Sequence, residues 1–319
     1  MRSLSKIAIA VLGVAIAGIG VAQAQDFPNH PIRVIVGPGP DIVPRLLGPK
    51  ISDVLGQSVV VEPRTGAGGV IAAQAVAAAP PDGHTLLQAT ASYTINTALQ
   101  TSPLDLGRDF APILLATTSP FVLLVHPSVP AKTLGELIAY AKANPGKLNY
   151  ASSGVGTPPH LAGELFKSAA GLDIVHVPFR EANSALNSVM AGATQMTFAI
   201  ASIAQAQISA GTVRGLAVTS RQASALVPGL PAVAEAGLPG FEVIGWNGYV
   251  APQGTPAAVI EKLNAALTAG LGDAELRKRL VSAGYEPADK NTPQDFAAFI
   301  AADTAKWRDL VAKTNMKAN

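Results

Sequence analysis

The stretch IRVIVGPGPDIVPRLLGPKISDVLGQSVVV, residues 32–61, decides the fold of this chain. Its first five residues are mostly β-branched and apolar, which predicts a buried strand over residues 32–36. A loop rich in glycine and proline follows, and a helix is expected from Asp41 to Leu55, with a kink at Pro49. Val59, Val60 and Val61 then form the core of a second predicted strand.

A third strand is expected at residues 85–90, after a helix that runs through Ala79 and a turn at residues 80–83. This alternation of strands and helices predicts a parallel sheet with helices on both faces. Ligands of such sheets bind beyond the carboxyl ends of the strands. Three predicted loops fall at that edge, at residues 37–40, 66–69 and 90–92.

A second round of the same pattern follows a strand predicted at residues 121–126. Thr133 and Glu136 have capping-box spacing, which predicts a helix over residues 134–143. Strands are expected near residues 147–151, 174–177, 194–199 and 215–219, and helices at 161–170 and 183–191. A returning strand is expected at 242–251, and two further helices begin at Thr255-Pro256 and Thr292-Pro293.

The predicted fold class is therefore α/β, with two Rossmann-like domains joined by a two-strand hinge. Residues 26–125 and 248–319 are assigned to domain I, and residues 126–247 to domain II. Because clefts between domains are preferred ligand sites, the ligand is expected between the two.

Residues 1–25 have the features of a cleaved secretory signal peptide. Arg2 and Lys6 precede an apolar core, and Ala22-Gln23-Ala24 resembles a cleavage site. Without this segment, 21 basic residues balance 21 acidic ones, and no basic patch for nucleic acid is evident. The chain has no cysteine and therefore neither disulfides nor a lipoprotein anchor. These features predict a freely diffusing periplasmic protein.

Residues 149–160, NYASSGVGTPPH, carry the strongest functional signal. Small and hydroxylated residues follow a predicted strand and precede a helix, a pattern that presents N–H groups and hydroxyls to an anion. The first choices for ligand contact are Ser153, Gly156 and Thr157, followed by Ser152 and His160. For His160, capping its helix or satisfying the loop is an equal alternative.

Segments along nearly the whole mature chain resemble the Bug family of extracytoplasmic solute receptors, the TctC-like substrate-binding proteins of tripartite tricarboxylate transporters. The matching segments are residues 31–36, 55–62, 66–69, 81–87, 109–112, 141–150, 152–160, 176–179, 216–220, 231–237 and 246–248. The resemblance implies a two-lobed periplasmic binding protein of type II. Its expected ligand is a small di- or tricarboxylate or aromatic acid, which it would pass to membrane permease subunits.

The resemblance also implies where the ligand is held. Main-chain N–H groups, hydroxyls and water would bind the carboxylate between the first loop, the 90–92 region and the 152–160 loop. The residues carried over are Gly37, Pro38, Gly39 and Asp41 of the first loop, together with Thr90 and Ser92. About three residues of the family's first loop are missing here, which is expected to alter the pocket.

Two further departures affect specificity. Ala199 stands where many relatives have an aspartate, so this receptor is expected to disfavour amino acids and to prefer acids without an ammonium group. Arg180 could grip a second carboxylate, or Glu181 could neutralise it as a surface pair. Trp246 and Tyr93 are the aromatics nearest the predicted cleft, as ligand-stacking or as packing residues.

Catalysis is not expected. The chain lacks a Gly-x-Ser-x-Gly elbow, a cysteine nucleophile and a phosphate loop. His160 and Glu164 have metal-binding spacing but no third ligand nearby, so neither a metal nor a cofactor is predicted. Alternatives to transport are a ligand-sensing partner of a membrane histidine kinase and an orphan receptor with an altered pocket.

Overall fold

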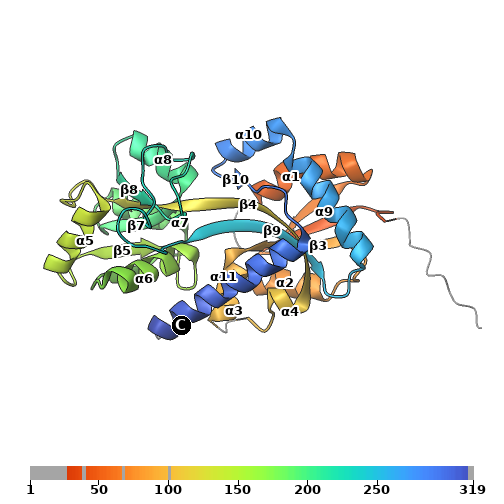
Figure 1. Cartoon of the computed structure of the whole chain (residues 1–319), viewed down its shortest axis with the longest axis horizontal. Helices are drawn as coiled ribbons and strands as arrows, with labels where there is room; N and C mark the ends of the chain where they lie inside the picture. The colour runs from red at the N-terminus through yellow and green to blue at the C-terminus, as the bar shows by residue number, and fades with distance from the viewer. Residues whose placement is uncertain (1–26, 38–40, 67–68, 100–101, 315–319) are drawn as a thin grey trace, which may run out of the picture.

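The computed structural model describes residues 27–37, 41–66, 69–99 and 102–314. The predicted signal peptide lies outside these residues, as do Pro38 and Gly39 of the first loop. Figure 1 shows two lobes joined by two long strands, β4 and β9. Among the helices that the structure describes, none combines the length and the apolar character needed to span a bilayer.

Lobe 1 is built on the parallel strands that the opening stretch predicts. β1 (Ile32–Val36) pairs in parallel with β2 (Val59–Pro63) and with β3 (Thr85–Thr90). β9 (Ile244–Pro252) lies antiparallel between β3 and β4 (Phe110–Val125), and β10 (Glu286–Pro287) pairs with β4. The helices of lobe 1 are α1 (Ile42–Leu55), α2 (Val70–Ala77), α3 (Ala91–Ala98), α4 (Leu106–Asp109), α9 (Ala257–Leu271), α10 (Ala274–Ser282) and α11 (Pro293–Thr314).

Alternate residues of β1 supply two cores, as a strand buried on both faces requires. Ile32, Val34 and Val36 pack with residues of α1 and α9. Ile35 belongs to the core on the other face, with residues of α2. Helices therefore cover both faces of this sheet, as predicted.

Lobe 2 contains a second sheet with four helices. β5 (Asn149–Ser152) pairs in parallel with β6 (Val175–Pro178) and β7 (Met196–Ile200), and the end of β4 lies between β7 and β8 (Arg214–Val218). The helices are α5 (Leu134–Ala143), α6 (Pro158–Ala170), α7 (Ala182–Met190) and α8 (Ala201–Ser209). One half of the predicted capping box is formed, because the N–H of Glu136 donates to Thr133 Oγ1 at 3.2 Å, while the Glu136 carboxylate accepts from the N–H of Lys132 at 2.6 Å.

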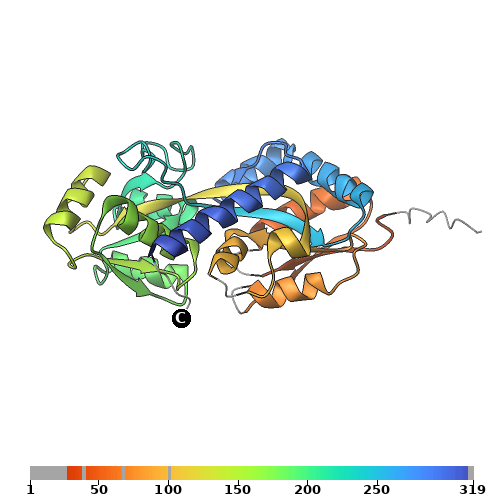
Figure 2. The ribbon, with the colours of Figure 1, turned by 60° about the horizontal axis from the view of Figure 1, so that its bottom comes forward.

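β4 begins much earlier than the predicted strand at residues 121–126. Its first part, to Pro120, pairs with β9, and Phe121–Val125 pairs with β7. This longer strand contains Pro112 and Pro120, although proline cannot donate a ladder hydrogen bond. A register shift between Pro112 and Leu114 accommodates the first of them. β4 and β9 thus form the connection between the lobes, and Figure 2 shows α11 running across it.

Candidate functional site

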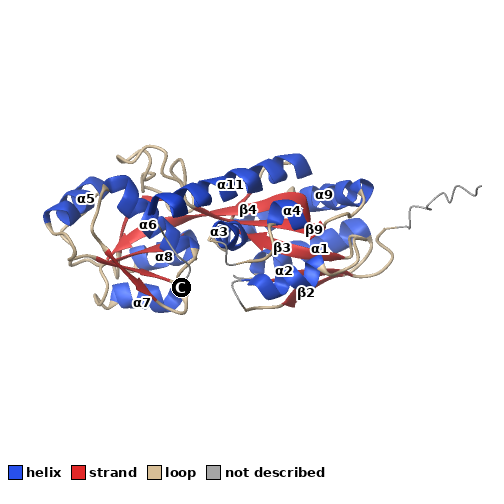
Figure 3. Cartoon of the chain, turned by 90° about the horizontal axis from the view of Figure 1, so that it is seen from below, coloured by secondary structure: helices blue, strands red, loops and turns tan. Residues whose placement is uncertain are grey.

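A cavity of about 450 Å³ is lined by both lobes near the β4–β9 connection. Lobe 1 contributes the start of α3, Ser119 of β4 and Tyr285, and β9 contributes residues 245–247. Lobe 2 contributes Ser153 and the starts of α6, α7 and α8. Figure 3 shows α3 on one side of this region and α6 and α8 on the other.

Four helices begin at the cavity wall. The N-cap residues of α3, α6, α7 and α8 are Thr90, Thr157, Glu181 and Ile200, and all four line the cavity. None of these side chains makes a capping hydrogen bond to its own helix. The N–H groups of a helix's first turn have no partner within the helix and carry partial positive charge, so this arrangement favours an anion.

The four N-termini do not offer the same donors. α6 begins with Pro158 and Pro159, which have no N–H to give. α3 carries an N–H at each early position, and Thr90 Oγ1 beside it is buried without a hydrogen-bond partner. Ser92 also lines the cavity at this terminus, and its hydroxyl makes no hydrogen bond to the described residues. The start of α3 is therefore the best-equipped anion position on the wall.

The loop between β5 and α6 is held from behind by two histidines. Gly154 and Gly156 have φ values of 113° and 77°, a region that glycine tolerates and other residues rarely adopt. The N–H of Gly156 donates to His160 Nδ1 at 3.2 Å, and His176 Nε2 lies 2.7 Å from Ser152 Oγ. These contacts turn Ser152 and His160 toward the protein interior, where both are buried.

Burial determines the charge of this histidine pair. It lowers the pKa of His160, and it lowers the pKa of His176 to about 4, with neighbouring His160 as the next cause. The two rings lie 4.3 Å apart. Both are thus neutral near pH 7, as His160 Nδ1 must be to accept the Gly156 hydrogen bond.

The structure brings some of the predicted site residues onto the cavity wall and leaves others off it. On the wall are Thr90, Ser92, Ser153, Thr157 and Ala199, together with Trp246. Not among its lining residues are Gly37, Asp41, Ser152, Gly156, His160, Arg180 and Tyr93.

Several of the residues off the wall have other contacts or surroundings. Asp41 forms an ion pair with Arg45 at 2.6 Å, and Arg180 is exposed to solvent. Tyr93 is buried, and a Cβ on Gly37 would lie 2.3 Å from its hydroxyl. Of the two alternatives for His160, the structure shows it satisfying the loop.

Sequence reasoning missed the wall contributed by α7 and α8, and Asn247. Glu181 and Asn183 lie at the start of α7, and Ile200 and Ile203 at the start of α8. The available signal was positional, because both helices follow directly on parallel strands whose carboxyl ends reach this edge.

Asn247 and Trp246 connect the wall to the protein interior. Asn247 accepts from Gln88 Nε2 at 2.7 Å and donates to Thr117 Oγ1 at 3.0 Å, which links β3, β9 and β4. Trp246 Nε1 donates to the buried carboxylate of Asp303 at 3.1 Å. Trp246 therefore packs in the core and lines the cavity at once.

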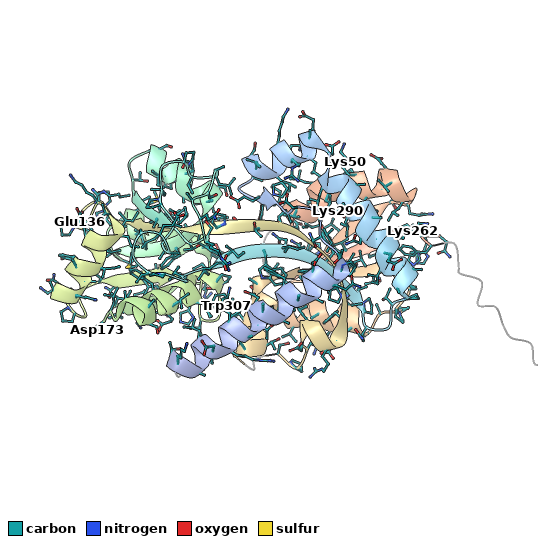
Figure 4. All side chains as sticks on the ribbon, in the orientation of Figure 1. Lys50, Glu136, Asp173, Lys262, Lys290 and Trp307 are labelled. Atoms are coloured by element: carbon teal, nitrogen blue, oxygen red, sulfur yellow. The ribbon has the colours of Figure 1, made fainter. Side chains whose placement is uncertain are left out.

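The charged residues labelled in Figure 4 lie away from the cavity, with Lys50, Lys262 and Lys290 on lobe 1 and Glu136 and Asp173 at the outer end of lobe 2. Within the described residues, Glu181 is the one lining residue with a charged side chain. Burial raises the pKa of Tyr285, so its hydroxyl stays neutral. An anion in this cavity would be held by helix dipoles and hydrogen bonds, because no described lining residue has a cationic side chain.

One group of described side chains could act as metal ligands, and it lies outside the cavity. His30, Asp82 and His84 bring their ligand atoms within 4.8 Å of one another, before the amino ends of β1 and β3. The rings of His30 and His84 are stacked 3.6 Å apart at 9°. Imidazole lone pairs lie in the ring plane, so two stacked rings do not point at one ion, and this group is no part of the cavity.

Known proteins match nearly the whole chain. The model of the TctC family, "Tripartite tricarboxylate transporter family receptor", matches residues 43–316. Protein BugT of Bordetella pertussis is 32% identical over 319 residues, covering 97% of this chain and 98% of BugT. An R. palustris protein solved with adipate has a TM-score of 0.80 and 31% identity over 91% of this chain and 99% of its own. MatC from Rhodopseudomonas palustris, solved with bound malate, has a TM-score of 0.77 and 32% identity over 89% of this chain and 100% of its own.

Proposed function

This chain belongs to the TctC family of tripartite tricarboxylate transporter receptors, and on that premise we propose that it binds a small organic carboxylate in the cavity between its lobes. The observation that carries the proposal is the meeting of four helix N-termini at one cavity. A carboxylate is a compact anion that accepts several N–H bonds at once. The first turns of α3 and α8 can supply such bonds, whereas α6 has prolines at its first positions. Adipate and malate, the ligands in two similar structures, belong to the same chemical class.

The donors closest to this role are side chains that the protein itself leaves unused. The hydroxyls of Ser92 and Ser153 and the amide of Asn183 make no hydrogen bond to the described residues, although all three residues line the cavity. Thr157 Oγ1 is different, because it donates to the carbonyl of Gly154 at 2.7 Å. We therefore place Ser92 and Ser153 first among the ligand-binding side chains, ahead of Thr157.

The cellular role follows from the family and from the predicted export. The receptor would collect its ligand in the periplasm and deliver it to the membrane permease of a tripartite tricarboxylate transporter. Two co-purification experiments test this assignment. In one the liganded protein is offered the permease subunits, and in the other it is offered a membrane sensor kinase. Capture by the kinase alone would argue for sensing instead of transport.

Calorimetry against dicarboxylates, tricarboxylates, aromatic carboxylates and acidic amino acids tests the binding function itself. At least one acid should bind with micromolar or tighter affinity. Ser153→Ala should then weaken binding by roughly 2- to 12-fold, as expected for one lost hydrogen bond of about 0.5–1.5 kcal/mol. Ser168→Ala, at an exposed position of α6, is the matched control and should bind normally. Absence of binding by every acid in the panel would refute the proposal.

A further inference from the structure

We propose that the ligand carries a single carboxylate on an apolar body, and that Glu181 is the residue that disfavours acids with a second carboxylate. This inference rests on the proposed function and narrows it to a substrate class. Three features of the cavity lead to it: the charge on its wall, the state of the α7 terminus and the apolar character of the remaining surface.

The charge on the wall is negative. Among the described lining residues there is no lysine, arginine or histidine, and Glu181 carries the one acidic side chain. The ion pairs of the described part of the chain do not include Glu181, so no basic partner offsets its charge there. A first carboxylate can be held by N–H groups and hydroxyls. A second one would find no cation and would face a like charge.

Arg180, which was expected either to grip a second carboxylate or to pair with Glu181, adds no charge to the cavity wall. It is exposed and lies off the cavity wall, and no ion pair joins it to Glu181 within the described residues. Of the two alternatives for Arg180, the pair with Glu181 is not formed among the described residues, and a grip on a second carboxylate would have to come from a residue off the cavity wall.

Glu181 also occupies the N-terminus of α7, a position that would otherwise favour a ligand anion. It is the N-cap residue of α7, and its side chain makes no capping hydrogen bond. A carboxylate at this point already complements the positive end of the helix. The α7 terminus is therefore a poor place for a ligand carboxylate, whereas the α3 terminus has no acidic residue in its first turn and has threonine at its N-cap.

The rest of the wall suits an apolar body. Phe121, Phe198 and Trp246 supply aromatic surface, and Leu186, Ile200 and Ile203 supply aliphatic surface. Ala199 adds a small apolar group. Placing a charged group against such a surface costs desolvation energy, and these apolar side chains offer no hydrogen bond or opposite charge to compensate for it. One polar end and an apolar remainder is the ligand shape that this wall complements.

Matched acid pairs test the inference on the full-length chain. Benzoate with terephthalate, and hexanoate with adipate, differ mainly by one carboxylate. By calorimetry at low salt, we expect the monocarboxylate of at least one pair to bind about five-fold or more tightly than its partner, the factor that a like charge about 4 Å away contributes even in water. The difference should shrink at high salt, because Glu181 is exposed and its charge is screened.

Glu181→Gln assigns the effect to this residue. It should improve binding of the dicarboxylate by about five-fold and leave the monocarboxylate nearly unchanged. Glu261→Gln removes an equal charge from an exposed position of α9 and should leave both affinities unaltered. Equal or tighter binding of dicarboxylates that is insensitive to Glu181→Gln would overturn the inference and leave the proposed function standing. Failure of all four acids, and of every acid in the wider panel, would overturn both.

Discussion

Replacing Asp303 by alanine should destabilise the fold by about 3–5 kcal/mol, the range for removing one partner of a buried charged network. Asp303 is 5% exposed, yet its carboxylate serves three elements. Oδ2 accepts from Thr94 Oγ1 of α3 at 2.7 Å and from Trp246 Nε1 of β9 at 3.1 Å, and Oδ1 pairs with Lys306 Nζ at 2.8 Å. Each hydrogen bond to the charged group contributes about 1.5–3 kcal/mol. Alanine would also leave the indole N–H of Trp246 buried without an acceptor.

Urea unfolding followed by circular dichroism measures this effect, with Asp309→Ala as the control. Asp309 lies on the same helix and pairs with Lys313 at 2.6 Å, but its side chain is 63% exposed. Its loss should stay within the scatter of surface substitutions, about 0.5 kcal/mol. A difference between the two variants below about 1 kcal/mol would refute the assigned role of Asp303, since burial is the main feature that separates them. Ligand affinity should fall in Asp303→Ala as well, because Thr94 anchors α3 and Trp246 lines the cavity.

Two further predictions concern the region behind the ligand loop. Acidification from pH 6.5 toward 4 should lower the melting temperature: burial, followed by neighbouring His160, lowers the pKa of His176 to about 4 from 6.5, so the unfolded chain takes up the proton first. The stability that comes from the neutral His176 is complete above pH 6.5 and is lost as the pH falls to 4. After allowance for partial exposure, we expect this contribution to the free energy of unfolding to be about 1–2 kcal/mol. A His176→Gln variant with an unchanged pH profile would show that His176 is not the cause. Gly163→Ala should cost about 1–3 kcal/mol in urea unfolding, because its Cβ would lie 2.2 Å from Tyr150 Cε2. Gly135→Ala, with nothing within 4 Å, should be neutral or stabilising by up to about 1 kcal/mol, and equal losses in the two variants would exclude the clash as the cause.

Local sequence signals predicted the elements whose stability is local. Thr292 was expected to begin the last helix, and its hydroxyl accepts from the N–H of Asp295, whose carboxylate in turn accepts from the N–H of Thr292. The cap of α9 shows the limit of such signals. Thr255 was expected as the N-cap, but Pro256 holds that position and Thr255 Oγ1 donates to the carbonyl of Pro252.

Elements that depend on tertiary contacts were missed. The sequence around residues 90–92 predicted only a loop, whereas α3 begins at Ala91. Its sequence, ASYTINTA, contains β-branched and aromatic residues of modest helix propensity. The hydrogen bond from Thr94 to Asp303 holds this helix against α11, 209 residues away in sequence. No local pattern contains that contact.

Ser152 and Ser153 show why the sequence could point to a candidate loop but not to the members of the loop that line the cavity. The loop was predicted as a ligand loop from its small and hydroxylated residues, which signal a turn and available donors, and two of its members, Ser153 and Thr157, line the cavity. Adjacent residues at the end of a strand point to opposite sides, and the sequence does not say which side is the cavity. The structure turns Ser152 inward to His176 and leaves Ser153 on the wall. That choice depends on where His176 lies, which the topology of β5 and β6 determines.

The topology also separates general affinity from specificity. α3, α6, α7 and α8 each follow a strand, β3, β5, β6 and β7 respectively, so their N-termini reach the cavity edge whatever their sequences are. Backbone N–H groups at the starts of α3, α7 and α8 favour anions in general, whereas the two prolines at the start of α6 offer none. What differs among the four termini is the N-cap side chain: Thr90 and Thr157 are neutral and polar, Ile200 is apolar and Glu181 is an acid. For the proposed carboxylate ligand, selectivity should therefore depend partly on the side chains at these positions, and Glu181 is the position where a single substitution should change the ligand class.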